Sequence, residues 1–255
     1  MNKTNPELLQ FKTRSEECQM ARTDPMNGRA VADRTFPPNG PIGICDSAEG
    51  LYAIKDSGKE LIICQRLIPF DMSEWLKNIA PSQLPDFRIL VRPVDVREAI
   101  KTQLDECGMP SGSGRDLFIG DIAKLVSIYA QITRRGLVDV RLDRIENDAC
   151  RKFHKDSVET RLLTTYIGPT TQWINPQYAE QALREQKAYG GPLGSLREHD
   201  VAIFRGRHAN LADGIVHRSP PIEGTRSVRL LLCLNVLSIV SPEAWRRTLP
   251  PIRDF

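Results

Sequence analysis

Apolar residues change their spacing between the two halves of the chain. In the first half they recur at intervals of three and four over residues 115–134, at Leu117, Ile122, Leu125, Ile128, Tyr129 and Ile132. This spacing predicts an amphipathic helix. A shorter helix is predicted to begin at Pro93, because proline favours a first helical turn. From residue 137 onward, apolar residues alternate with Asp139, Arg141 and Asp143. That is the period of a half-buried strand, so helices precede strands.

The second half contains a succession of strand candidates separated by turn residues. They cover residues 137–145, 158–167, 170–174, 200–205, 214–217 and 226–240. Such a succession predicts an α+β fold with a double-stranded β-helix, or jelly roll, at about residues 137–240. Helical support is expected from about residues 70–135. We expect residues 1–41, which are polar and rich in proline, to be a loosely ordered lead-in, and residues 42–255 to form a single globular domain.

Composition narrows the class of protein without naming a function. The 255 residues are 40% hydrophobic and 26% charged, which is ordinary globular usage. A net charge of +3 is too small to predict a nucleic-acid or membrane partner. The N-terminus lacks the pattern of a secretory signal, and six scattered cysteines are interpreted as free thiols, which together favour the cytoplasm. Neither the substrate, whether small molecule or protein, nor the oligomeric state follows from these patterns.

Three residues in the second half have the order of a metal site. His154 and Asp156 stand two apart, so on a strand their side chains would point to the same face. His217 opens a later apolar run and could meet them from another strand. Two histidines and one carboxylate form the facial triad of non-haem Fe(II) oxygenases, which leaves open positions on the metal.

Each of the three residues also has a simpler interpretation. His154 lies in a charged segment and is compatible with the protein surface, while Asp156 could belong to a turn. His217, between apolar residues and a rigid Pro220-Pro221 pair, could be a core histidine. The combination of order and separation favours the metal site over these alternatives.

The order His-x-Asp followed by a distant His resembles the Fe(II)/2-oxoglutarate-dependent oxygenases. In that family a basic residue beyond the second His binds the far carboxylate of 2-oxoglutarate. Arg226 and Arg229 stand nine and twelve residues after His217. If residues 225–236 are a regular strand, Arg226 shares a face with Leu230 and Leu232, so Arg226 is preferred over Arg229.

The resemblance also implies a hydroxyl group that assists co-substrate binding. Thr164 and Tyr166 are the candidates, since they would lie on one side of the strand at residues 158–167. Threonine and tyrosine are also ordinary strand residues, so this position alone does not require a binding role.

The amino-acid sequence of the second half resembles one family in particular. The strings Phe-His-x-Asp, Leu-Leu-Thr-Thr-Tyr-Ile-Gly-Pro-Thr-Thr-Gln-Trp and Val-His-Arg-Ser-Pro-Pro-Ile-Glu-Gly-Thr are similar to a bacterial domain-of-unknown-function family, number 1826. That family brings no established reaction. The leading hypothesis is therefore an oxygenase that uses Fe(II) and 2-oxoglutarate on an unknown substrate. The alternatives are a non-enzymatic zinc-binding or zinc-sensing jelly roll and a metal-free scaffold.

Overall fold

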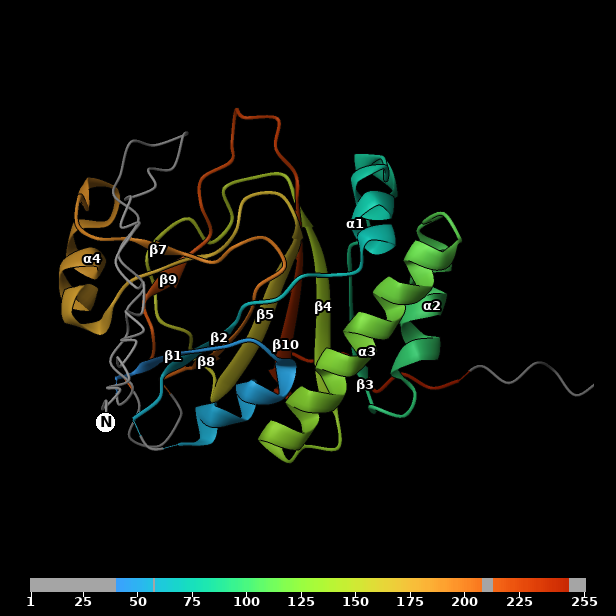
Figure 1. Ribbon diagram of the computed structural model, residues 1–255, viewed down its shortest axis with the longest axis horizontal. Helices are drawn as coiled ribbons and strands as arrows, with labels where there is room; N and C mark the ends of the chain where they lie inside the picture. The colour runs from blue at the N-terminus through green and yellow to red at the C-terminus, as the bar shows by residue number, and fades with distance from the viewer. Residues whose placement is uncertain (1–39, 57, 208–212, 248–255) are drawn as a thin grey trace, which may run out of the picture.

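A seven-stranded sheet with helices on one side forms the body of the protein (Figure 1). The computed structural model describes residues 40–56, 58–207 and 213–247. Most of the expected N-terminal lead-in therefore lies outside the described residues. The sheet has the strand order β1-β2-β8-β5-β10-β4-β3. Its strands are Ile42–Cys45 (β1), Leu61–Cys64 (β2), Phe87–Val91 (β3), Val138–Ile145 (β4), Thr160–Ile167 (β5), Val201–Arg205 (β8) and Arg229–Val236 (β10).

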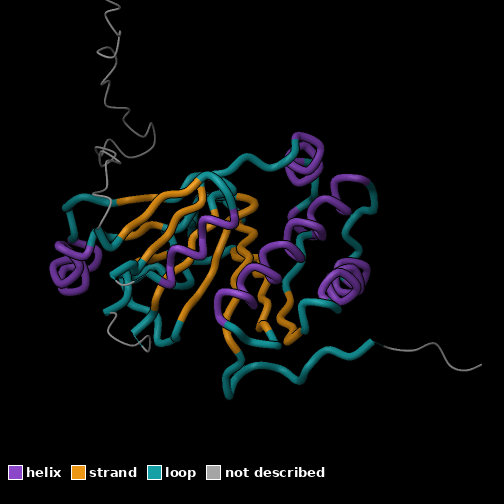
Figure 2. Tube along the Cα trace, turned by 60° about the horizontal axis from the view of Figure 1, so that its bottom comes forward, coloured by secondary structure: helices purple, strands orange, loops and turns teal. Residues whose placement is uncertain are grey.

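The first half of the chain supplies three α-helices on the same side of this sheet (Figures 1 and 2). They are Phe70–Lys77 (α1), Val96–Glu106 (α2) and Ser113–Thr133 (α3). A 3₁₀ helix, η1 (Ala48–Lys55), packs against β2 and α3. The predicted helical support is confirmed, because α3 matches the expected helix at residues 115–134 and α2 the shorter one. Within the described residues, no helix combines the length and apolar character needed to cross a membrane.

A second, three-stranded sheet has the order β7-β6-β9. Its strands are Gln172–Trp173 (β6), Gly194–Ser195 (β7) and His217–Arg218 (β9). A further bridge pairs His154 with His217 and adds a fourth segment beside β9. With the His154 segment counted as part of the smaller sheet, the chain from β4 onward alternates between the two sheets, except that β6 and β7 follow one another in the smaller one. This is the topology of a jelly roll, so the predicted fold class is confirmed.

Strand alternation gives the large sheet two different faces. On β10, Leu230, Leu232 and Leu234 join the core beneath the helices. The intervening Leu231 and Cys233 line a cavity inside the jelly roll instead. β5 follows the same rule, since Leu162 packs under the helices while Leu163 points into the jelly roll.

Two features depart from the expected architecture. The first half adds β1 and β2 to one edge of the jelly-roll sheet and β3 to the other, through backbone hydrogen bonds to β8 and β4. The second half contains a helix, α4 (Ala179–Glu185), which lies at the opposite end of the molecule from α1–α3 (Figure 1). Short 3₁₀ segments stand on either side of α4, at Pro176–Tyr178 (η3) and Gln186–Ala188 (η4), and another, Pro81–Gln83 (η2), precedes β3.

Candidate metal centre

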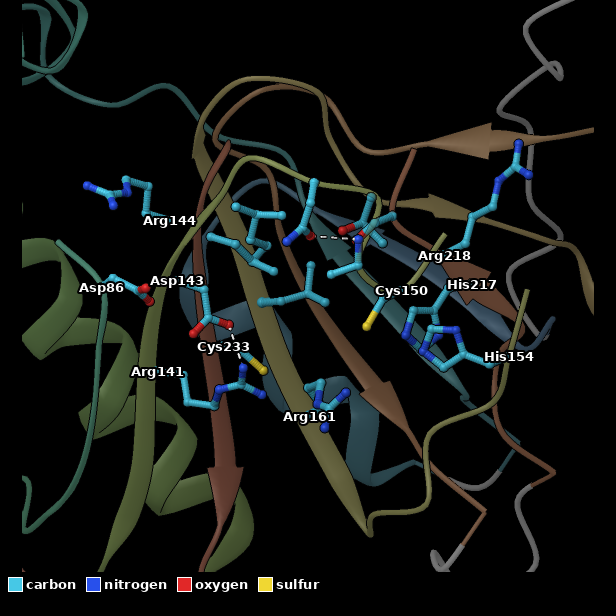
Figure 3. Close-up of a pocket in the computed structure, with 17 residues that line it drawn as sticks. Asp86, Arg141, Asp143, Arg144, Cys150, His154, Arg161, His217, Arg218 and Cys233 are labelled. Atoms are coloured by element: carbon cyan, nitrogen blue, oxygen red, sulfur yellow. Dashed lines mark hydrogen bonds and ion pairs between the residues drawn. The ribbon is translucent and has the colours of Figure 1, made fainter. Parts of the chain in front are cut away.

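His154 and His217 face each other across the smaller sheet. The N–H of His154 donates to the carbonyl of His217, and the N–H of His217 donates to the carbonyl of His154, each at 3.0 Å. The reciprocal pair fixes the register of the two segments. The centroids of the imidazole rings are 4.6 Å apart, and both rings appear side by side in Figure 3.

Asp156 completes a group of three potential metal ligands. Its Oδ2 lies 3.5 Å from Nε2 of His217, and its Oδ1 lies 3.7 Å from Nε2 of His154. One ligand atom from each residue lies within 4.8 Å of the other two. Oδ2 of Asp156 is buried without a hydrogen-bond partner. A buried carboxylate oxygen in this state is costly unless a cation satisfies it, so the three residues fit a metal ion.

The backbone orients both histidines for coordination through Nε2. Nδ1 of His154 lies 2.8 Å from the carbonyl of Lys152, and Nδ1 of His217 lies 3.1 Å from the carbonyl of Ile215. A proton on each Nδ1 satisfies those carbonyls and leaves the Nε2 lone pairs available, which is the usual outer-shell device of metal-binding histidines. Burial lowers the pKa of His217, so its neutral, metal-binding form is favoured.

Arg161 supports the carboxylate from the neighbouring large sheet. Its guanidinium donates to Oδ1 of Asp156 at 2.6 Å and to Oδ1 of Asn235 at 2.8 Å. One oxygen of Asp156 is thereby held in place while the other remains unpaired. Sequence reasoning missed Arg161, although the alternation on β5 places it on the same face as Leu163.

The triad opens onto a cavity of about 280 Å³ between the sheets (Figure 3). His154, His217 and Arg161 line one end, and Leu163 and Leu231 contribute an apolar wall. Toward the other end lie charged residues that include Arg141, Asp143, Arg144 and Asp86, as Figure 3 shows. The cavity is therefore large enough for a small organic molecule next to the triad.

Arg229 is a fully buried charged group beside this cavity. Its side chain is 0% exposed, and it donates to the carbonyl of Pro169 and to Oγ of Ser219, both at 2.6 Å. A longer contact of 3.5 Å reaches Oγ1 of Thr171. Ser219 and Thr171 themselves line the cavity. Among the described residues no carboxylate pairs with Arg229, and burial lowers its pKa to about 10.

The position of Arg229 depends on a close approach between two loops. Gly168 follows β5 with φ at +84°, and a Cβ there would clash with the carbonyl oxygen of Val228. Glycine is required by both the left-handed conformation and the missing space. Gly168 therefore allows a close contact with Val228, the residue immediately before β10.

The expectation that residues 225–236 form one regular strand is wrong. β10 begins at Arg229, and residues 223–226 form a turn in which Arg226 is exposed and has a φ of +59°. Neither Arg226 nor Arg229 is among the residues that line the cavity, but Arg229 contacts Ser219 and Thr171, which do line it. The face that Arg226 was expected to share with Leu230 and Leu232 packs against the helices.

Thr164 and Tyr166 share a face of β5, as expected, but it is the face turned away from the cavity. Tyr166 is 1% exposed, packs edge-on against Phe118 of α3 and donates to Oδ2 of Asp121 at 2.6 Å. Thr164 pairs with Leu232 of β10, whose side chain joins the helix-side core. The structure therefore does not place either hydroxyl beside the triad.

Asp148 ties together the two loops that frame the site. Its Oδ1 accepts hydrogen bonds from the N–H groups of Ile222 and Glu223, each at 2.8 Å, and its Oδ2 pairs with Arg151. These backbone hydrogen bonds lower the pKa of Asp148. One loop leads to His154 and the other joins β9 to β10. Asp148 therefore holds the histidine-bearing segments in register.

Comparison with known proteins assigns the chain to a family. The model of a family described as "Protein of unknown function (DUF1826)" matches residues 45–235, and the chain belongs to this family. Among curated proteins, no sequence matches it.

Several solved structures share distant similarity with the chain. The dioxygenase for auxin oxidation 1 from Arabidopsis thaliana, in a complex with 2-oxoglutarate, is 9% identical over 78% of this chain and 92% of its own, with a TM-score of 0.43. A full-length protein from Neurospora crassa, in complex with alpha-KG, is 10% identical over 84% and 86%, with a TM-score of 0.40. A prolyl-4-hydroxylase from Pseudomonas putida is 10% identical over 66% and 94%, with a TM-score of 0.29. At these overlaps, function has to be inferred from the chain's own residues.

Proposed function

We propose that this protein is an Fe(II)-dependent oxygenase that uses 2-oxoglutarate to oxidise a small molecule or protein. His154, Asp156 and His217 bind the metal in this proposal. Arg229, in place of Arg226, binds the far carboxylate of the co-substrate. Ser219 and Thr171 take the supporting role that the sequence had suggested for Thr164 and Tyr166.

The observation that carries the proposal is the buried guanidinium of Arg229, which has neutral hydrogen-bond acceptors and no carboxylate partner among the described residues. A cation that is fully removed from water is costly unless an anion pairs with it. Arg229 contacts two hydroxyl side chains that line the same cavity as His154 and His217. A dicarboxylate that reaches from the triad to Arg229 would satisfy the buried charge, and a guanidinium can hold a carboxylate through two parallel hydrogen bonds.

The chain's own residues prepare the site for this chemistry. His154 and His217 present Nε2 because their Nδ1 atoms face backbone carbonyls. Arg161 holds Oδ1 of Asp156 and leaves Oδ2 for the metal. Leu163 and Leu231 give the cavity an apolar wall that limits the access of water.

Iron and 2-oxoglutarate, when bound, supply the oxidative chemistry, in which O₂ oxidises both the keto acid and the substrate. The protein contributes position and charge. His154, Asp156 and His217 would hold the metal, and a site with three protein ligands would leave positions open for the co-substrate and O₂. The second end of the cavity, near Arg141 and Asp143, is left for the substrate.

An anaerobic titration tests this function directly. Metal-free protein is titrated with Fe(II) and then with 2-oxoglutarate, and the visible charge-transfer band of the iron–keto acid chelate is recorded. The proposal expects a saturable band that is absent in Asp156→Asn. Asp143→Asn is the matched control, because Asp143 lines the same cavity without belonging to the triad.

A second pair of variants tests the co-substrate residue. Arg229→Met should weaken 2-oxoglutarate binding by about 100-fold or more, because a buried charge pair is lost. Arg226→Met removes an arginine from the exposed turn at residues 223–226 and should leave the titration unchanged. The reverse result would return the role to Arg226.

Zinc binding without oxygenase chemistry is the competing function. The same three ligands suit Zn²⁺, and Zn²⁺ generally binds a given site more tightly than Fe²⁺. If iron or zinc binds in stoichiometric amount and 2-oxoglutarate gives no band, the oxygenase proposal fails and a zinc-binding jelly roll replaces it. If neither metal binds, the fold acts as a scaffold.

A further inference from the structure

Two cysteines face each other at the edge of the large sheet. β1 and β2 are parallel, and their register pairs Cys45 with Cys64 at the last position of each strand. Both side chains belong to the helix-side core, Cys64 within it and Cys45 packed against it. Neighbouring strands lie about 4.8 Å apart, which falls within the roughly 4.4–6.8 Å between Cα atoms that a disulfide spans.

Both cysteines are free thiols. Each thiol has the largest effect on the pKa of the other, raising that of Cys45 and lowering that of Cys64, which agrees with their pairing in the strand register. Two neighbouring thiols, one of them with a lowered pKa, are the arrangement from which a disulfide forms.

Local packing keeps Cys45 in this position. Gly50 of η1 lies so close that a Cβ there would overlap the Cβ of Cys45 and approach its Sγ to 2.8 Å. Gly50 therefore leaves the space that the side chain of Cys45 occupies beside β2, and a larger residue there would displace it. Cys45 is half-buried and Cys64 is 0% exposed, so a small reagent meets Cys45 first.

We propose that Cys45 and Cys64 form a reversible disulfide that links the edge strand β1 to β2. With hydrogen peroxide as the oxidant, the O–O bond breaks as one of the two sulfur atoms becomes a sulfenic acid and one water leaves. The other sulfur atom then attacks it, the S–S bond forms, and a second water leaves. The two thiols lose two electrons and two protons to the peroxide, and a dithiol reductant restores both.

This modification is independent of the proposed oxygenase function. It involves neither the triad nor the cavity, since neither cysteine lines the cavity. A bond between residues 45 and 64 closes the chain that contains η1, and it restrains the unfolded chain as well as the sheet edge.

Peptide mapping of the full-length protein tests the proposal. The metal-free protein, kept with a chelator, is treated with hydrogen peroxide, denatured, blocked with N-ethylmaleimide and digested without reduction. We expect a linked peptide that joins Cys45 to Cys64, its disappearance after dithiothreitol, and a rise in Tm of roughly 5 °C or more in the oxidised protein.

Variants separate this pair from the other thiols. Cys45→Ala should abolish the linked peptide and the rise in Tm, whereas Cys107→Ser, which alters a thiol bonded to the carbonyl of Leu104, should keep both. The mapping of the unmodified sequence decides the matter even if a variant fails to fold. The proposal is overturned if Cys45 and Cys64 both carry the maleimide while exposed Cys150 is oxidised, or if either is linked to another cysteine.

Discussion

Each face of the large sheet holds an arginine and an aspartate largely away from water, but the two faces pair these charges differently. On the helix side, Asp121 of α3 pairs with both terminal nitrogens of the Arg66 guanidinium and accepts a hydrogen bond from Tyr166. Each of these charged groups has a partner of opposite sign. On the cavity side, Asp156 pairs with Arg161 through Oδ1 alone, its Oδ2 has no hydrogen-bond partner, and Arg229 has no carboxylate among the described residues.

We interpret this difference as one between groups that stabilise the fold and groups that would bind a ligand. When every group of a polar network has a partner, the network stabilises one arrangement and leaves no group free to bind a ligand. Groups without a partner lower the stability of the ligand-free protein, and this stability is recovered when a ligand pairs with them. On this basis we expect the helix-side group to stabilise the fold and the cavity-side group to bind a ligand, as the proposed function requires.

The largest expected effect is the loss of the helix-side carboxylate. Asp121→Ala leaves the guanidinium of Arg66 buried without an anion, and we expect the free energy of unfolding to fall by about 3–5 kcal/mol. Urea denaturation measures it. Asp156→Asn is the comparison on the cavity side. It should cost less, about 1–2 kcal/mol, because the amide oxygen still accepts from Arg161 and the charge on the unpaired Oδ2 is removed. Equal losses would remove the distinction between the two faces.

Replacement of Arg229 and of Arg66 should show the same difference between the two faces, with a smaller change in the free energy of unfolding. In metal-free protein, Arg229→Met is expected to leave the free energy of unfolding unchanged or to raise it by about 1 kcal/mol, because an unpaired buried cation is removed. Urea denaturation of Arg66→Met provides the comparison, since that change leaves Asp121 without its cation and should be clearly destabilising. A loss above about 3 kcal/mol for Arg229→Met would make Arg229 a structural residue.

Loss of the hydrogen bonds that Asp148 accepts from Ile222 and Glu223 should affect the cavity side alone. Asp148→Ala releases the loop at Ile222 and Glu223, and we expect metal affinity to fall by about tenfold, as for other outer-shell changes. Competition with a chromogenic chelator measures the affinity. Asp148→Asn keeps an oxygen acceptor for both N–H groups and should restore most of it. An unchanged affinity in Asp148→Ala would show that the loops hold their register without this residue.

The smallest expected effect is a pH dependence on the helix side. Burial lowers the pKa of His199, whose Nε2 lies 3.2 Å from the carbonyl of Tyr166. The unfolded chain therefore binds a proton more readily than the folded chain below a pH of about 6.5, and stability should decrease as pH falls from about 7 toward about 5. His199→Asn, which tolerates the left-handed backbone at this position, should flatten this decrease in urea denaturation series at several pH values. Identical slopes would assign the effect to other groups.

Patterns in the sequence determined the elements and the ligand spacing. The period of three and four predicted α3, and the alternation from residue 137 predicted β4 and the jelly roll that follows. The helices and strands were predicted correctly because helix and strand periodicity are local properties of the chain. His154 and Asp156 stood two apart, and the structure brings them together with His217, although His154 lies in an isolated bridge and Asp156 lies outside the strands.

Tertiary structure decided which face of each strand meets the cavity. Periodicity groups Tyr166 with Thr164, but only the packing of α3 shows that this group turns away from His154. The choice between Arg226 and Arg229 depended on where β10 begins, which the contact between Gly168 and Val228 sets. Contacts between residues far apart in the chain leave no periodic signal in the sequence, and so the folded structure alone assigns the buried charge to Arg229.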